Sequence, residues 1–415
     1  MTNLLKTGLM ALAVSTALAM PSSAMDKVDP ANWDSVKAAA KGTTVHWHAW
    51  GGSPRINAYI DWAAQQVESQ YGVEVVHVKV DDTANVVSQV VAEKAAGKNK
   101  DGAVDLIWIN GENFASMKEQ NLLLDTDGDA TDGWATQLPN WQYVDVAGKP
   151  TITTDFTIPT DGLESPWGMA KMVFFHDTAL EKELPGSAAE LLQYAQANPG
   201  RFTYPLPPDF IGSSFLKQIL SEVVVDPTVL QSPVVEDEFE ATVEPLWTYL
   251  DAMHAVAWQS GRNFPKSYPA MRQLLADGEV DFAFAFNPAD ASAAIAAGEL
   301  PDTVRSFVFD EGTLGNTHFV AIPYNAAAPA GALVLANFLI SPEAQKHKQD
   351  PDVWGDPTVL DITSVPADVK AQFDALDLGI ATLSPDELGP MLPEPHASWM
   401  SRIEVEWARR YGAGN

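Results

Sequence analysis

The chain has 415 residues, with 25 Lys or Arg against 55 Asp or Glu, and its formal net charge at pH 7 is −30. Such an acidic chain repels nucleic acid and anionic membrane surfaces, so we expect neither as a partner. It contains no cysteine, which excludes a disulfide scaffold, a thiol nucleophile, a thiolate metal site and lipidation at a cysteine. A spread-out acidic surface is typical of solubility and does not by itself make the ligand a cation.

The N-terminal segment has the order of a secretory signal peptide. Lys6 precedes an almost wholly apolar stretch, residues 8–20, that is too short to span a bilayer. Ser22 and Ala24 then supply small side chains at the −3 and −1 positions of a cleavage site. We therefore expect residues 1–24 to be removed on export to the periplasm, with an uncleaved membrane anchor as the alternative.

The first part of the remaining chain alternates predicted strands and helices. Runs rich in β-branched and aromatic residues predict strands over 43–50, 73–80 and 104–109. Between them, apolar residues at helical spacing predict helices over 56–70 and 83–93. This β-α-β-α-β order implies a parallel sheet with right-handed crossovers.

A second series of elements follows and then the chain returns. An apolar strand is predicted at 280–286, and a strand at 317–322 leads back to the first series. We therefore expect two lobes, with 43–168 plus 316–415 forming the first and 169–315 forming the second. The expected fold class is α/β, each lobe being a mostly parallel sheet flanked by helices. The chain crosses between the lobes at least twice, and two crossings form a hinge.

Several segments resemble those of bacterial extracellular solute-binding proteins. Residues 320–323 (VAIP) and 332–345 (ALVLANFLISPEAQ) are similar to the return strand and helix of that family. Residues 274–283 are similar to its "L..GEVD" segment, and residues 102–107 to a strand of its first lobe. The segments occur in the family order, and the match spans most of the mature chain. The branch that includes thiamine, polyamine and iron binders is the most similar.

This resemblance implies a Venus-flytrap periplasmic-binding-protein fold that captures a small molecule between its lobes. It also implies ABC permease and ATPase subunits of the inner membrane as partners. We expect a monomer without a cofactor. The resemblance gives a fold and a role, and leaves the ligand open.

Candidate ligand-binding residues follow from position in the fold. In open α/β sheets, ligands bind beyond the carboxyl ends of the strands, where loops meet helix N-termini. This rule selects the loops that follow the predicted strands and the loop beside the hinge, and two tryptophans are added because an indole stacks on rings and methylene chains. The candidates are Trp50, Gly51, Gly52, Ser53, Arg55, Asp82, Asn110, Glu112, Asn113, Trp167, Gly212, Ser213, Ser214, Asn287, Asp290 and Asn316.

These residues favour different ligands. Glu112 and Asp82 would pair with an amine, whereas Arg55 would hold a carboxylate or phosphonate bidentately. An amine-bearing cation such as thiamine or a polyamine is the first choice, a small carboxylate or phosphonate the second, and a sugar the third. Structural alternatives remain, because Asp82, Ser213 and Ser214 are also typical helix caps, and a tryptophan is more often part of a core.

Two patterns resemble metal sites. His46 and His48 share one face of a strand, but a site needs about three or four ligands and the sequence places no third. The acids of 125–132 resemble a calcium loop, although Ala130 stands where the loop needs glycine and Thr136 where it needs a bidentate glutamate. The sequence therefore predicts no metal ligands, and calcium at 125–132 stays open.

The motifs of common hydrolases are missing from the sequence. It contains no G-x-S-x-G elbow, no H-E-x-x-H helix and no phosphate-cradling P-loop. We therefore predict a binding receptor and not an enzyme. A receptor that signals through a membrane partner would have the same sequence features as a transport receptor.

Overall fold

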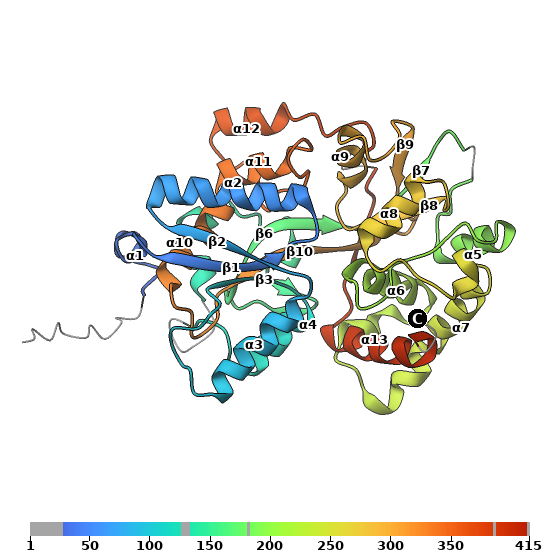
Figure 1. Ribbon diagram of the computed structural model, residues 1–415, viewed down its shortest axis with the longest axis horizontal. Coiled ribbons are helices and arrows are strands. Elements are labelled where there is room, and N and C mark those ends of the chain that lie inside the picture. Colours follow the sequence, from blue (N-terminus) through green and yellow to red (C-terminus); the bar gives the residue numbers. More distant parts are fainter. Residues whose placement is uncertain (1–27, 126–132, 181–182, 385–386, 413–415) are drawn as a thin grey trace, which may run out of the picture.

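The computed structural model describes residues 28–125, 133–180, 183–384 and 387–412. These residues form two lobes, each with its own sheet and core, joined through β6 (Glu164–Lys171) and β10 (Thr313–Ala321) (Figure 1). The two-lobe α/β fold predicted from the sequence is confirmed. The predicted signal segment 1–24 lies outside the described residues. Among the described helices, none has the length and apolar content needed to cross a bilayer.

The first lobe is built on a mixed sheet in the strand order β11-β10-β3-β1-β2, with β6 also paired to β10. Its other strands are β1 (Thr44–Trp50), β2 (Glu74–Val80), β3 (Leu106–Ile109) and β11 (Met391–Pro393). β1 pairs in parallel with β2 and β3, as the sequence order predicted. β10 runs antiparallel to β3 and β6, because it enters this lobe from the opposite direction.

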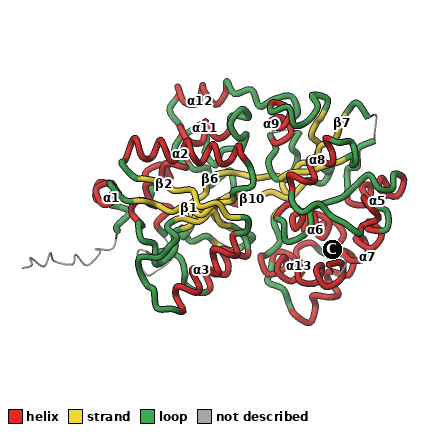
Figure 2. The backbone as a smooth tube through the Cα atoms, viewed as in Figure 1, coloured by secondary structure: helices red, strands yellow, loops and turns green. Residues whose placement is uncertain are grey.

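Helices lie on both faces of this sheet (Figure 2). They are α1 (Trp33–Ala40), α2 (Pro54–Tyr71), α3 (Thr83–Ala95), α4 (Glu112–Glu119), α10 (Pro329–Leu339), α11 (Pro342–Gln349) and α12 (Ala367–Asp374). The bounds of α2 follow from its sequence. Ser53 accepts a hydrogen bond from the Ile56 amide at 3.5 Å, Pro54 is the first helical residue, and Gly72 ends the helix in the left-handed conformation. A short hairpin, β4 (Thr154–Asp155) and β5 (Ile158–Pro159), adjoins the lobe.

The second lobe departs from the expected parallel sheet. β7 (Val173–Asp177) lies between β8 (Phe282–Ala285) and β9 (Val304–Phe307) and is antiparallel to both. β8 and β9 run in the same direction because helix α9 connects them, but β7 is inserted between them with the opposite sense. The helices are α5 (Ala188–Ala197), α6 (Phe210–Val223), α7 (Phe239–His254), α8 (Tyr268–Ala276), α9 (Asp290–Ala296) and α13 (Ala397–Tyr411).

The C-terminal helix α13 belongs to the second core, which corrects the expected lobe boundary for this helix. Trp399, Ile403 and Trp407 recur at helical spacing and are buried among residues of α6 and α7. The Trp407 indole N–H donates to the Tyr204 hydroxyl at 2.9 Å. The chain therefore crosses between the lobes a third time, between α12 and α13, and Figure 1 shows α13 beside α6 and α7.

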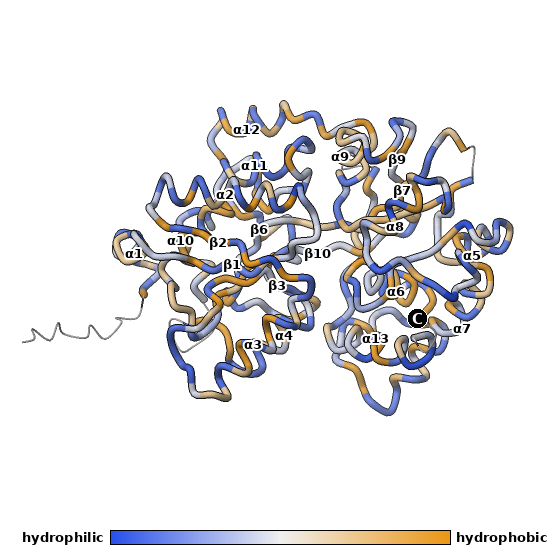
Figure 3. The backbone as a smooth tube through the Cα atoms, in the orientation of Figure 1, coloured by the Kyte–Doolittle hydropathy of each residue, from blue (hydrophilic) through white to orange (hydrophobic). Residues whose placement is uncertain are grey.

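Antiparallel pairing of β6 with β10 forms the hinge. β6 ends at Lys171 and β7 begins at Val173, so the chain passes at Met172 from the first sheet to the second. Trp167 of β6 is fully buried, with its ring centre 4.8 Å from that of Trp108 and 5.3 Å from those of Trp47 and Trp354. Hydrophobic segments follow the strands and α6, whereas many peripheral loops are hydrophilic (Figure 3).

Candidate functional site

The carboxyl ends of the parallel strands in the first lobe point toward the second lobe (Figure 1). Each of the following helices begins there. Ser53 caps α2, Asp82 caps α3 by accepting from the Ala84 amide at 2.8 Å, and Glu112 is the first residue of α4. Helix α4 also contacts α13 of the second lobe. The site expected from strand topology is therefore an interface between the lobes.

One lysine of the second lobe lies among carboxyl groups at this interface. The Lys217 ammonium of α6 is 2.6 Å from Glu394 Oε2 and 4.1 Å from the centre of the Phe156 ring. The side chain is 1% exposed, so its charge is shielded from water. Asn316 of β10 donates to Glu394 Oε1 at 3.1 Å and so fixes this carboxylate from the hinge.

Carboxyl groups of both lobes interact with Lys217. The interlobe acidic cluster comprises Asp82, Glu112, Asp155, Glu394 and Glu404. Burial raises the pKa of Glu112, and the negative charges of Glu394 and Asp82 raise it further, while its own backbone amide and Lys217 oppose the shift. One ammonium thus faces more acids than it neutralises.

Glu404 brings a carboxyl group from α13 to the same place. Burial is the main cause that raises its pKa to about 7, and the charge of Glu112 adds to the effect. The Ser213 hydroxyl donates to Glu404 Oε1 at 2.5 Å, which favours the ionised form. Because Glu112 is on α4 and Glu404 on α13, like charges from the two lobes repel each other when the lobes meet.

A buried carboxyl group supports the start of α4. The Gly111 amide donates to Asp155 Oδ2 at 2.6 Å, and burial raises the pKa of Asp155 well above its ordinary value. Gly111 has a φ of 58°, and a β-carbon there would lie 2.5 Å from the Phe156 ring. Only glycine therefore allows this approach. Glu164 is also buried, and burial together with Asp155 raises its pKa well above the ordinary range.

The structure brings part of the predicted set together. Asp82, Glu112, Ser213 and Asn316 all belong to or contact the interlobe acidic cluster. Gly212 adjoins Ser213, and a β-carbon on it would lie 2.1 Å from the Pro205 carbonyl oxygen, so its role is a close backbone approach. Half-buried Asn110 and Asn113 flank the start of α4, and half-exposed Trp50 with Gly51, Gly52 and Ser53 lies at the start of α2.

Other predicted residues have partners within the protein. Trp167 is buried in the hinge core and has no surface for stacking on a ligand. Ser214 donates back to the Phe210 carbonyl at 2.7 Å, within its own helix. Asp290 accepts from Tyr268 and lies 3.4 Å from Arg272 Nη1. These three contacts are structural.

Arg55 and Asn287 form a second contact between the lobes. The Arg55 guanidinium donates to the Pro351 carbonyl at 2.5 Å and, across the interface, to the Ala293 carbonyl of α9 at 2.7 Å. Asn287 of the second lobe donates to the Trp354 carbonyl at 3.3 Å. In this conformation Arg55 therefore binds main chain, where the sequence suggested a ligand anion.

Replacing Arg55 tests the role of this contact in closure. Arg55→Met keeps a long side chain and removes the donors to Pro351 and Ala293, so the unliganded lobes should separate more readily. We expect the variant to have a larger radius of gyration than the wild type in small-angle scattering. Its melting temperature should be unchanged, because the cores of the two lobes are unaltered. Arg262→Met is the control, because Arg262 follows a short helical turn of the second lobe and, within the described residues, makes no hydrogen bond across the interface. A radius equal to that of the wild type would contradict this role.

The histidine pattern does not assemble a metal site in the described residues. His46 Nδ1 lies 3.2 Å from Asp105 Oδ2, and His77 Nε2 lies 3.2 Å from the Ala49 carbonyl oxygen. Within the described ranges no three His, Asp or Glu side chains are arranged to hold an ion. Residues 126–132 of the calcium-like segment lie outside the described residues.

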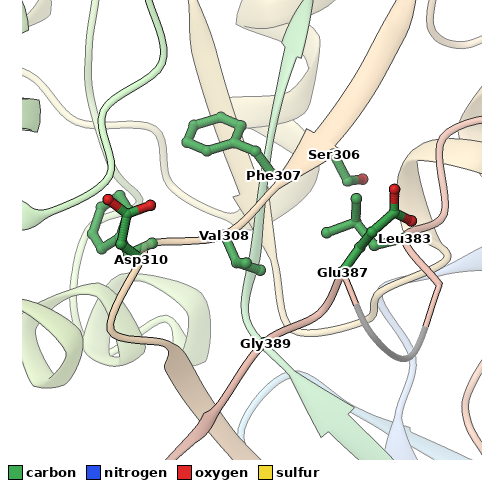
Figure 4. Close-up of a pocket in the computed structure, with 8 residues that line it drawn as sticks. Ser306, Phe307, Val308, Asp310, Leu383, Glu387 and Gly389 are labelled. Carbon is green, nitrogen blue, oxygen red and sulfur yellow. The ribbon is translucent and has the colours of Figure 1, made fainter.

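A separate hollow is lined by the end of β9, the residues after it and part of the C-terminal segment (Figure 4), and no acid of the interlobe acidic cluster lines it. Phe307, Val308 and Asp310 line one side, and Leu383 and Glu387 line the other. The last two flank residues whose placement is not described, so we assign the hollow no role.

Sequence reasoning missed the residues at the centre of the interface. Lys217 is mid-helix, Phe156 is in a hairpin turn, and Glu394 and Glu404 belong to the C-terminal segment that was expected in the first lobe. Lys217 had one available signal, because it is the only charged residue in the apolar run 210–220. A charge in such a run predicts a buried partner.

A family model for bacterial extracellular solute-binding proteins matches residues 62–371. The match covers most of the chain, and the chain belongs to this family. The resemblance noted in the sequence is thereby confirmed. The family accounts for the two lobes and the hinge, and it does not identify a ligand.

One relative is similar along nearly the whole chain. It is protein YnjB of Escherichia coli (strain K12), 44% identical over 381 residues, which are 92% of this chain and 94% of that protein.

Solved structures of the same fold share little sequence with this chain. A putative spermidine/putrescine ABC transporter protein from Listeria monocytogenes has a TM-score of 0.60 at 15% identity, covering 90% of this chain and 99% of that one. The periplasmic binding protein AfuA from Actinobacillus pleuropneumoniae has a TM-score of 0.59 at 13% identity, covering 89% and 99%. A ferric binding protein from Campylobacter jejuni has a TM-score of 0.60 at 10% identity, with the same coverage. At these identities the likeness concerns the fold alone.

Proposed function

We propose that this protein is a periplasmic receptor that captures a small amine-bearing cation between its lobes and delivers it to the permease and ATPase subunits of an ABC importer. Family membership supports the receptor role, and the related fold of transporter-associated binding proteins supports the importer. The export signal expected at 1–24 fits a periplasmic site of action. Binding and release, without chemistry on the solute, is the whole of the proposed activity.

The interlobe acidic cluster is the observation that carries the choice of a cation. Carboxyl groups from α4, α13 and the third crossing meet around Lys217, and burial, with their mutual repulsion as a smaller cause, raises the pKa of Glu112 and Glu404. A ligand cation would relieve this repulsion only when the lobes close, so its binding energy would favour the closed state. The anionic alternative loses support because Arg55, its main candidate, is bound to carbonyl groups.

A ligand screen tests this function. Mature protein purified gently from the periplasm is analysed by native mass spectrometry, and then by thermal shift against amines (thiamine, spermidine, putrescine), small carboxylates, phosphonates and sugars. We expect an amine to raise the melting temperature, because a ligand of the folded state stabilises it. Stabilisation by carboxylates alone would reject the cation.

Replacing Glu112 shows where the amine binds. Glu112→Gln keeps the shape of the side chain and removes its charge, so the affinity for the cation should fall by about tenfold or more. Glu68→Gln is the matched control, because Glu68 is an exposed acid of α2 in the same lobe. Titration calorimetry measures both. Equal affinities of the two variants would place the ligand elsewhere.

A further inference from the structure

The surroundings of Lys217 are those of a bound ammonium ligand. Its nitrogen lies 2.6 Å from the Glu394 carboxylate, 4.1 Å from the centre of the Phe156 ring and 5.4 Å from the centre of the Phe210 ring. A carboxylate together with aromatic faces is the arrangement by which proteins recognise organic ammonium groups. We call the Glu394 carboxylate and the rings of Phe156 and Phe210 the ammonium box. In this conformation the cation inside the ammonium box is the side chain of Lys217.

The residues of the ammonium box come from different parts of the fold. Lys217 and Phe210 are on α6 of the second lobe, Phe156 is in the hairpin beside the first lobe, and Glu394 follows β11 in the third crossing. The contact of Lys217 with Phe156 therefore joins the lobes. Glu394 is in turn held by Asn316 of the hinge strand β10. Opening of the lobes would take the ammonium away from the Phe156 ring.

We propose that the Lys217 ammonium is an internal stand-in for the cationic group of the ligand: it occupies an ammonium subsite formed by Glu394, Phe156 and Phe210, and a bound ligand displaces it. The inference rests on the proposed function, because it places the recognition of the cation in one subsite. It adds that the empty receptor is held closed by its own lysine. The affinity for a ligand would then depend on how closely the length of its methylene chain and the size of its ammonium group match those of the Lys217 side chain.

Emptying the box provides the test. Lys217→Ala removes the ammonium and its methylene chain, whereas Lys217→Met removes only the charge and still fills the space. The probe is n-butylammonium, with 1-butanol and butyrate as the neutral and anionic analogues. We expect n-butylammonium to bind Lys217→Ala at least about tenfold more tightly than the wild type or Lys217→Met, because only the alanine variant leaves both a cavity and an unpaired carboxylate. The analogues should bind none of the three.

The radius of gyration distinguishes a Lys217 side chain that replaces the ligand from one that only forms a structural ion pair. Lys217→Ala should have a larger radius of gyration than the wild type, and n-butylammonium should restore the smaller radius. Lys348→Ala is the matched control, because the Lys348 ammonium is also buried against a carboxylate, that of Asp356, and near the rings of Trp167 and Trp354, but within the first lobe. The amine should leave the radius of this variant unchanged.

The outcomes are distinct from those of the ligand screen. Circular dichroism first confirms that each variant is folded. If Lys217→Ala does not fold, Lys217→Met is measured in its place, because this variant also lacks the ammonium and should have a larger radius of gyration than the wild type. Equal binding of n-butylammonium to all variants, equal effects of 1-butanol, or a Lys217→Met radius equal to that of the wild type would overturn the proposal. If wild type binds no amine in the screen while Lys217→Ala binds n-butylammonium and closes, the ammonium subsite stands and the proposed physiological ligand falls.

Discussion

Asp356→Ala should lower the free energy of unfolding by about 3–5 kcal/mol, because it leaves the ammonium of Lys348 buried without its counter-charge. Both side chains are fully buried and in direct contact. Burial lowers the pKa of Lys348, and the charge of Asp356 opposes that shift. The other Asp356 oxygen lies 3.0 Å from His318 Nε2 of the hinge strand, so the substitution also removes a polar tie to the hinge. Urea unfolding monitored by tryptophan fluorescence measures the loss.

The control for this prediction is a lysine–aspartate pair at the surface. Lys370 and Asp374 are 2.6 Å apart on α12, and their side chains are 41% and 53% exposed. Asp374→Ala should change the free energy of unfolding by less than about 1 kcal/mol. If Asp356→Ala is no more destabilising than Asp374→Ala, the buried pair is not what stabilises the segment after α11.

The elements of the first lobe were predictable because their signals are local. The apolar runs that became β1, β2 and β3 alternate with amphipathic helices, and caps such as Ser53 and Asp82 marked where helices begin. The direction of β7 was not predictable. It depends on which strand is inserted between β8 and β9, and no local pattern encodes that choice.

Only the part of the candidate site that follows the strands of the first lobe was predictable from the sequence. The rule that ligands lie beyond the carboxyl ends of strands selected Asp82 and Glu112, and the structure places these two acids near each other at the interface. It could not select Glu404, because α13 lies far along the chain and its lobe is decided by where Trp399, Ile403 and Trp407 find a core. Arg55 was assigned from its charge and position, yet the carbonyls that bind it come from segments more than two hundred residues away.

Affinity for the cation should depend on pH through Glu404. Its pKa is raised to about 7, chiefly by burial, so the carboxyl group is partly protonated at neutral pH. A cation binds the ionised form more tightly, and affinity should therefore fall as the pH drops below about 7, by up to about tenfold per pH unit for one linked proton. Titration calorimetry between about pH 5.5 and 8.5, with the amine found in the screen, measures this slope.

Stability of the empty protein should show the opposite slope. Because the folded-state pKa of Glu404 lies above its ordinary value of 4.5, the folded protein binds the proton more tightly than the unfolded chain. This contribution to stability is present at low pH and is lost as the pH rises through about 4.5 to about 7.

Glu404→Gln removes the titrating group, so it should flatten the pH dependence of both affinity and stability. Glu112, whose pKa is also raised, keeps a residual slope of the same sign. A pH dependence of affinity identical in Glu404→Gln and wild type would show that the cation does not meet the α13 carboxylate. Opposite slopes for affinity and stability in the wild type are expected because protonation of Glu404 removes the cost of burying its charge and also removes the charge that the cation pairs with.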